Sequence, residues 1–338
     1  MRLLGEIAPA LRSYLETEVV PNAHEMDADP ERLRPAVQFV LRRVLAARNA
    51  SASTPWRGLT RAELAALYGA SGALGLVCAQ HHAATTWFAA RANAELQARH
   101  LPALRAGERL WGLATTHLSS SGPPAVVAER TARGFAVSGC ARWVSGHGFF
   151  DDLLLAARAP GECSFHAVIA LRAAGVRVGP MLALGAMRAT NTASVSLDAL
   201  PVAPADVFLF RDERASAPPP SSVAAPALEP VGHPFLGAAA TALDVAEQAA
   251  RDRDLLRVAD LIAPLHDELR RIWERDGQRA EADEMIQRCV RLAVLLAGGA
   301  AAALAHAANR LHRESLLYEV LALGHRDLAA KVSALLAA

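Results

Sequence analysis

The sequence contains few cysteines, and their positions exclude several kinds of protein. The four are scattered along the chain, with no CxxC pair among them: Cys78, Cys140, Cys163 and Cys289. A disulfide scaffold or a zinc ribbon needs closely spaced pairs, so neither is expected. We predict that these cysteines are reduced core residues of a cytoplasmic protein.

The sequence also lacks an excess of one charge and a long apolar run. It carries 35 Lys and Arg against 34 Asp and Glu. Because no basic block is present to neutralise phosphates, we expect no nucleic-acid partner. The longest uncharged apolar run, residues 292–305, is shorter than the ~18–20 residues of a bilayer span and predicts a buried helix. The N-terminal stretch has acidic residues inside an amphipathic pattern, unlike a signal peptide, so no membrane association is expected.

Several common catalytic motifs are absent. The sequence has no GxSxG, HExxH or Walker motif. Gly69, Gly72 and Gly75 lack the GxGxxG spacing and a preceding strand, which excludes a Rossmann turn. His81 and His82 are adjacent rather than four residues apart, so they cannot share a helix face, and we expect no metal site.

The chain does contain a stretch of strand signals between two helical blocks. Hydrophobic residues make up 52% and charged residues 20%, as in a globular protein. Within residues 111–208, short apolar–polar alternations are punctuated by Gly and Pro, whereas the flanking apolar residues recur at helical spacing. We therefore predict an α+β fold, mostly α, with a helical domain at 1–107, a β-domain at 108–210, a linker at 211–227 and a helical bundle at 228–338.

Individual helices can be placed within these blocks. Thr60 and Glu63 fit a capping box, in which two residues satisfy the first free N–H groups of a helix. In the C-terminal block, helices are predicted at 235–250 and 255–275. A third is expected to follow, and a long fourth to reach Leu323.

The order of these parts, and short motifs within them, resemble the acyl-CoA dehydrogenase family. Residues 101–108, Leu-Pro-Ala-Leu-Arg-Ala-Gly-Glu, resemble the family's lead-in to its β-domain. Residues 185–192 and 200–204 resemble a turn and the exit of that domain. The resemblance implies an N-terminal helical domain, a central β-barrel or sandwich that binds FAD, and a C-terminal helical bundle. The chain would be a divergent, shortened member, because its C-terminal block is shorter than usual.

The resemblance also assigns residues to the flavin. The family's Thr-Glu-Pro and Trp-x-Thr segments, on neighbouring strands, correspond to Thr116-His117 and to Trp143-Val144-Ser145. Trp143 keeps a planar wall for the isoalloxazine, and the Ser145 hydroxyl can bond a flavin carbonyl or N5. His117 in place of the family's acid is a departure. The alternative interpretation makes Trp143 a core aromatic.

A catalytic base is harder to assign. Desaturation beside a thioester carbonyl needs a carboxylate that takes the α-proton while a hydride leaves to the flavin. Leu323, which cannot accept a proton, occupies the family's usual Glu position. Glu229 lies near the position used by a minority of members, and Glu319 lies one helical turn before Leu323. Both are candidates, and the alternative for each is an ordinary surface residue.

The family's cationic cofactor contacts are only partly matched. Arg251 and Arg253 stand in place of an Arg-x-x-Phe-Gly motif that helps to hold FAD across a subunit interface, but no Phe or Gly follows. Arg188 is expected either to brace the cofactor pocket through an ion pair or to tie a strand to a helix. The charged segment at 309–317 resembles another helix of the family. We expect it to serve domain packing rather than ligand binding. Gly298 lies in an Ala-rich run, where helix–helix contact explains small residues.

Three functions remain open at this point. The first is an FAD-dependent dehydrogenase that desaturates an acyl thioester, on CoA or a carrier protein, with an unidentified electron acceptor. The second is a two-component flavin monooxygenase, which takes reduced flavin from a partner reductase and needs no carboxylate base. The third is a degenerate subunit that partners a true dehydrogenase. The resemblance further implies a homodimer or homotetramer packed through the C-terminal helices.

Overall fold

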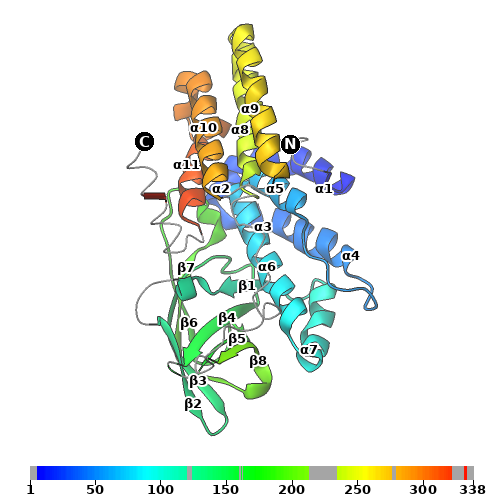
Figure 1. Cartoon of the computed structure of the whole chain (residues 1–338), viewed down its shortest axis with the longest axis vertical. Coiled ribbons are helices and arrows are strands. Elements are labelled where there is room, and N and C mark those ends of the chain that lie inside the picture. Colours follow the sequence, from blue (N-terminus) through cyan, green and yellow to red (C-terminus); the bar gives the residue numbers. More distant parts are fainter. Residues whose placement is uncertain are drawn as a thin grey trace.

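The structure is a computed structural model, and it describes residues 6–119, 124–159, 161, 163–212, 234–275, 279–321 and 331–332. Figure 1 shows the sheet at one end of the molecule and the C-terminal helices at the other, with the first N-terminal helices between them and the last one beside the sheet. These N-terminal helices are α1 (Pro9–Tyr14), α2 (Ala23–Ala28), α3 (Pro30–Gln38), α4 (Ala46–Arg48), α5 (Arg61–Ala70), α6 (Gly72–Arg91) and α7 (Ala94–Arg105).

Four of these helices, α3, α5, α6 and α7, begin at side-chain caps. At α5 the Thr60 hydroxyl accepts the Glu63 N–H at 3.1 Å, and the Glu63 carboxylate accepts the Thr60 N–H at 2.8 Å. The predicted capping box is therefore confirmed. At α6 the Ser71 hydroxyl accepts the Leu74 N–H at 3.3 Å. Such caps satisfy N–H groups that have no partner within the helix.

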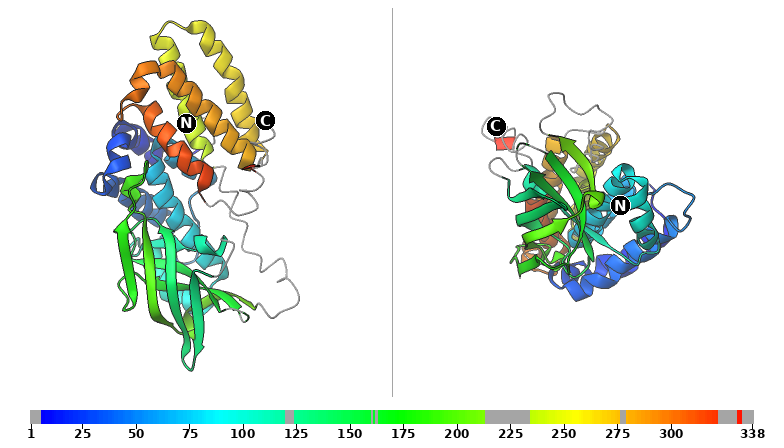
Figure 2. Two further views of the ribbon diagram at one scale, coloured as in Figure 1. Left: turned by 90° about the vertical axis from the view of Figure 1, so that its left-hand side faces the viewer. Right: turned by 90° about the horizontal axis from the view of Figure 1, so that it is seen from below.

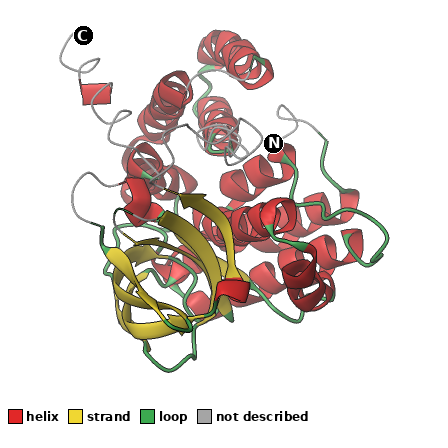
Figure 3. Ribbon diagram, turned by 60° about the horizontal axis from the view of Figure 1, so that its bottom comes forward, coloured by secondary structure: helices red, strands yellow, loops and turns green. Residues whose placement is uncertain are grey.

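The sheet contains eight strands and curls around its own core (Figure 3). Seven follow the order β6-β7-β3-β2-β4-β5-β8, and β1 pairs with β4 in parallel. Alternate apolar residues of β2, β3, β4, β5 and β7 form the buried interior, as expected for strands with one face covered. The strands are β1 (Trp111–Ala114), β2 (Val126–Thr131), β3 (Gly134–Val144), β4 (Asp152–Ala159), β5 (Cys163–Ala170), β6 (Val176–Met181), β7 (Ala193–Val202) and β8 (Val207–Asp212).

The C-terminal bundle extends away from the sheet (Figure 2). It contains α8 (Leu236–Asp252), α9 (Leu256–Glu274), α10 (Arg279–Ala297) and α11 (Ala307–Val320). Among the described residues, one helical segment, Arg279–Ala302, is long and apolar enough to cross a membrane by composition. Its α-helical part packs against α8 and α11, as a core helix of a bundle does.

The prediction of one buried helix over residues 292–305 is wrong. The α-helix ends at Ala297, and a 3-10 turn, η8 (Gly298–Ala302), follows it. Gly298 has φ +59°, in the left-handed region that glycine adopts most easily at a helix end. A Cβ on Gly298 would also lie 2.4 Å from the Arg253 guanidinium. This glycine therefore ends a helix, and helix–helix contact is not the reason for it.

The helical blocks and the sheet pack closely against one another. A Cβ on Gly237 of α8 would lie 1.7 Å from the Ala65 carbonyl oxygen of α5, so these two helices meet backbone to backbone. Between α6 and the sheet, His81 Nδ1 accepts the Trp111 N–H of β1 at 3.0 Å. Burial lowers the pKa of His81 to about 4, which keeps the ring neutral and able to accept this bond.

These observations confirm the predicted fold class, with helical N- and C-terminal parts around a sheet. The helices predicted at 235–250 and 255–275 correspond to α8 and α9. β8 continues to Asp212, inside the segment predicted as a linker. The rest of that segment lies outside the described residues.

Candidate functional site

Trp143 lies on the surface near the end of β3. The pairing of β3 with β7 shifts between Ala141 and Val144, and Trp143 itself has φ +60°. A bulge of this kind re-aims a side chain, and a non-glycine residue in the left-handed region costs about 1–3 kcal/mol. The side chain is 59% exposed, so the interpretation of Trp143 as a core aromatic is wrong. The backbone instead presents a flat indole to solvent.

Thr116 and His117 lie beside this strand, in the 3-10 turn η5 (Thr116–Ser119). The Thr116 hydroxyl donates to the carbonyl oxygen of Arg142, the residue before Trp143, at 3.2 Å. His117 Nε2 donates to the Ala156 carbonyl of β4 at 2.9 Å, and burial lowers the pKa of the imidazole. His117 is therefore a neutral ring that ties the turn to the sheet, and Thr116 is adjacent to Trp143 in space.

Ser145 begins a row of buried hydroxyls between the ends of two strands. Its Oγ lies 2.8 Å from Thr192 Oγ1, which lies 3.0 Å from Thr190 Oγ1. The Thr190 hydroxyl donates to the Met187 carbonyl at 2.7 Å. The cavity that Ser145 lines inside the sheet is only ≈ 10 Å³, room for about one water molecule. This cavity is therefore too small to hold a flavin ring.

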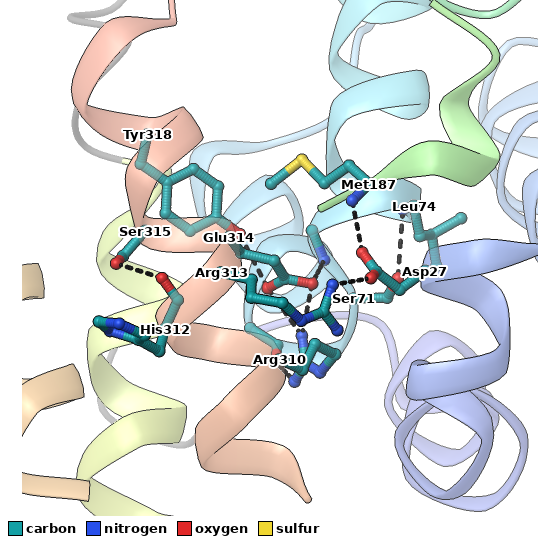
Figure 4. Close-up of polar contacts among 12 residues, drawn as sticks. Asp27, Ser71, Leu74, Met187, Arg310, His312, Arg313, Glu314, Ser315 and Tyr318 are labelled. Atoms are coloured by element: carbon teal, nitrogen blue, oxygen red, sulfur yellow. Dashed lines mark hydrogen bonds and ion pairs between the residues drawn. The ribbon is translucent and has the colours of Figure 1, made fainter. Parts of the chain in front are cut away.

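The turn that carries these threonines is fixed by a buried carboxylate from another part of the chain (Figure 4). Asp27 of α2 accepts the Met187 N–H at 2.5 Å and the Arg313 guanidinium of α11 at 2.6 Å. Arg313 also donates to the Gly185 carbonyl at 3.0 Å. Met187 has φ +53° and is fully buried. One carboxylate thus joins the first helical block, the sheet turn and the last described long helix.

A second buried ion pair, Arg310 and Glu314, joins the ends of two helices. The Arg310 guanidinium donates to both Glu314 oxygens, at 3.0 and 2.8 Å, and to the Gly69 carbonyl near the end of α5 at 3.3 Å. Glu314 accepts the Gly72 N–H at the start of α6 at 3.0 Å. Positive charge at a helix C-terminus and negative charge at an N-terminus both favour the helix dipoles.

Burial has the largest effect on the pKa of Glu314 in this pair. Glu314 is 0% exposed, and removal from water raises the pKa of its carboxyl despite the adjacent guanidinium. Tyr318 donates its hydroxyl proton to Glu314 at 3.2 Å, and burial raises the pKa of that phenol as well. The charged segment at 309–317 therefore supplies packing between helices, the role preferred for it.

The remaining predicted site residues lie elsewhere. Arg251 pairs with Glu247 at 3.0 Å, and Arg253 donates to the Ala297 carbonyl at 2.7 Å, where α10 ends. Both are at the C-terminal end of α8, the end of that helix far from the sheet (Figures 1 and 2). Within this chain they are therefore not beside Trp143.

Glu319 is half-buried on α11, and its carbonyl oxygen accepts the Lys331 ammonium at 3.1 Å. Arg188 is exposed in the turn η6 (Arg188–Thr190) and has no ion-pair partner among the described residues. Glu229 and Leu323 lie outside the described residues. The structure therefore places Thr116 beside the backbone of Trp143, whereas Ser145 is buried two residues further along the chain.

Sequence reasoning missed Asp27, Thr190 and Thr192. The two threonines stand inside the segment that resembles the family turn, so their position is detectable but their hydrogen bonds are not. Asp27 and its partner Arg313 are 286 residues apart. Nothing in the sequence marks that pairing.

The sheet flanked by two helical blocks defines a known fold. No protein-family model and no curated protein matches the sequence. Among solved structures, the chain is similar to a glutaryl-CoA dehydrogenase in complex with glutaryl-CoA, with TM-score 0.70 and 18% identity over 95% of this chain and 93% of that one. It is also similar to an acyl-CoA dehydrogenase from Bacillus anthracis in complex with FAD, with TM-score 0.72 and 16% identity over 95% and 67%.

A third similar structure is FkbI, a protein for biosynthesis of the methoxymalonyl extender unit of the Fk520 polyketide immunosuppressant. Its TM-score is 0.71 with 18% identity, and the match covers 97% of this chain and 99% of that one. Together, the three similarities show that the chain has the fold of the acyl-CoA dehydrogenases. At these identities they define the fold and leave the reaction open.

Proposed function

We propose that this protein is a flavin-dependent oxidoreductase that binds FAD against Trp143 and oxidises an acyl thioester, carried on CoA or on a carrier protein. The proposal is supported by structures of the same fold that contain FAD or glutaryl-CoA. FAD, when bound, supplies a two-electron acceptor. The residues of this chain hold and orient it.

The exposed indole of Trp143 carries the proposal. A side chain of this size, 59% exposed on a strained backbone, needs a reason other than core packing. A planar aromatic ligand that stacks on the indole is one such reason. The Thr116 hydroxyl lies near this indole, because it donates to the carbonyl of Arg142, and it can still accept a hydrogen bond from a ligand.

Removal of the α-proton needs a base, and Glu319 is the described candidate. It lies on α11, one residue beyond Tyr318 of the buried cluster. Glu229 is the other candidate from the sequence. We expect Glu319→Gln to abolish thioester-dependent flavin reduction while leaving FAD binding intact. Glu274 is an exposed acid on α9, so Glu274→Gln is the matched control and should react like the wild type.

The experiment mixes FAD-loaded protein with a panel of acyl-CoA and acyl-carrier thioesters without oxygen, and follows the visible absorbance of the flavin. The proposal predicts bleaching with at least one thioester. A protein that holds FAD but is never bleached by any thioester would contradict it.

Leu323 favours a second candidate function, because an aliphatic residue at the usual Glu position cannot act as a base. A two-component flavin monooxygenase of this fold would take reduced flavin from a partner reductase and would need no such carboxylate. Oxygen consumption by the protein with supplied reduced flavin, above the rate of free reduced flavin, would support it. An unchanged rate would exclude it.

We also propose a homodimer or homotetramer that packs through the C-terminal helices. Large apolar side chains are exposed there on α9, α10, α11 and the segment before α11: Leu261, Leu295, Leu304, Leu316 and Val320. A contiguous exposed apolar patch marks an interaction surface, and α10 packs against both α9 and α11. Light scattering during gel filtration tests this, and a monomer at micromolar concentration would contradict it.

A further inference from the structure

Two cations share one buried carboxylate where α10 packs against α11. Asp283 of α10 is 5% exposed, and its Oδ2 lies 3.3 Å from Arg279 Nε and 2.5 Å from Lys331 Nζ. Its other oxygen, Oδ1, is buried and has no hydrogen-bond partner among the described residues. A carboxylate so far from water needs a positive partner, and this one has two.

Each of these cations also binds the last turn of α11. The Arg279 guanidinium donates to the Tyr318 carbonyl at 3.0 Å, and the Lys331 ammonium donates to the Glu319 carbonyl at 3.1 Å. Carbonyls at a helix C-terminus have no partner within the helix, and positive charge there is favourable. We call Asp283, Arg279 and Lys331 the C-terminal clasp.

The two cations of the clasp are attached to different parts of the chain. Arg279 belongs to α10, as Asp283 does, and lies one helical turn before it. Lys331 belongs to the C-terminal end of the chain, and residues 322–330 join it to the end of α11. If Lys331 leaves, Arg279 still neutralises Asp283. The departure of Lys331 therefore leaves no buried charge without a counter-ion.

We propose that Lys331 is a releasable anchor, which lets the C-terminal end of the chain detach from α10 and α11 and rebind while the rest of the protein stays folded. Detachment costs the hydrogen bonds of one ammonium group, which is little compared with global unfolding. The Lys331 side chain is 23% exposed, so the released ammonium has water close by. Because the anchor is a charge, its neutralisation opens the clasp.

Lys331 is the only lysine in the sequence, so a lysine-specific endoproteinase has a single cleavage site in this chain. A protease cuts the detached form, and the cleavage rate of the full chain therefore reports how often Lys331 is released. We expect the wild type to be cut at least about tenfold more slowly than a synthetic peptide of residues 322–338, because hydrogen bonds to charged groups hold the site closed. The rate should hardly change in low urea, because local detachment exposes little surface.

Variants separate the two partners of the anchor. Asp283→Asn removes the negative charge and should raise the cleavage rate about tenfold. Glu284 is the exposed acid next to it, so Glu284→Gln is the matched control and should be cut like the wild type. Hydrogen exchange tests the amine itself, at the Leu321 N–H that closes the last turn of α11. Lys331→Gln should exchange this amide faster than the wild type, and Lys331→Arg, which keeps the charge, should exchange it more slowly than Lys331→Gln.

Cleavage of the full chain as fast as the peptide would overturn the inference, and so would an Asp283→Asn rate equal to that of the wild type. A wild-type rate that rises with urea as steeply as global unfolding would also overturn it, as would equal exchange in Lys331→Gln and the wild type. Circular dichroism confirms that each variant is folded. None of these measurements involves a flavin, so the clasp and the proposed function fail separately.

Discussion

Replacing Arg310 by methionine should strongly destabilise the protein, because it leaves Glu314 buried without its counter-ion. Glu314 is 0% exposed and would keep only the Gly72 N–H and the Tyr318 hydroxyl as partners. Breaking a buried ion pair from one side costs about 3–5 kcal/mol. We therefore expect the free energy of unfolding to fall by about that amount at pH 7.

The double variant Arg310→Met with Glu314→Gln is the matched control. The glutamine oxygen can still accept the Gly72 N–H, and no charge is left buried. We expect this variant to recover most of the stability lost in Arg310→Met, because a buried pair as a whole contributes little net stability. Denaturant unfolding, followed by circular dichroism, gives both free energies.

The loss should also depend on pH. Burial raises the pKa of Glu314, and removing Arg310 raises it further. A carboxyl whose folded pKa exceeds its unfolded pKa favours the folded state at low pH, and that contribution is lost as pH rises through the folded pKa. The free energy of unfolding that Arg310→Met loses relative to the wild type should therefore grow from pH 4 to pH 7. The loss in the double variant should not depend on pH in this way. A single-variant cost below about 1 kcal/mol at pH 7, or a deficit without pH dependence, would refute this reasoning.

Two further predictions concern packing and buried histidines. Gly237→Ala should destabilise the protein by more than about 2 kcal/mol, because its Cβ would lie 1.7 Å from a carbonyl oxygen of α5. Gly299→Ala is the control, since nothing lies within 4 Å of its Cβ, and its melting temperature should be unchanged or higher. Burial lowers the pKa of both His81 and His82 to about 4, against an unfolded value near 6.5. The unfolded chain therefore binds protons that the folded chain cannot, so stability is full above pH 6.5 and declines towards pH 4, by about 3 kcal/mol for a single histidine. His82→Gln should flatten this decline, and an equal slope in both proteins would contradict it.

Local signals in the sequence predicted local structure well. Thr60 and Glu63 make the expected capping box because both partners lie within one helical turn. The order of helices and strands follows from the change of apolar spacing at either end of the β-domain. The break at Gly298 was missed, because an Ala-rich run favours a helix and only the backbone angle of +59° shows where it ends.

The candidate site was predictable only in part. Trp143 and Ser145 are two residues apart in the sequence, yet one is exposed and the other buried, because the bulge at the end of β3 interrupts the alternation of the strand. The partner of Ser145 is set by the pairing of β3 with β7, which places Thr192 beside it. Asp27 reaches this region only through the three-dimensional packing of α2.

The account depends most on the claim that Trp143 stacks on a flavin. Titration of the full chain with FAD, followed by quenching of flavin fluorescence, measures this directly in the wild type and in Trp143→Ala. We predict saturable binding to the wild type and at least about tenfold weaker binding to the variant, because stacking on an aromatic ring contributes about 1–3 kcal/mol. Equal affinities in the two proteins, or no binding to the wild type, would contradict the claim.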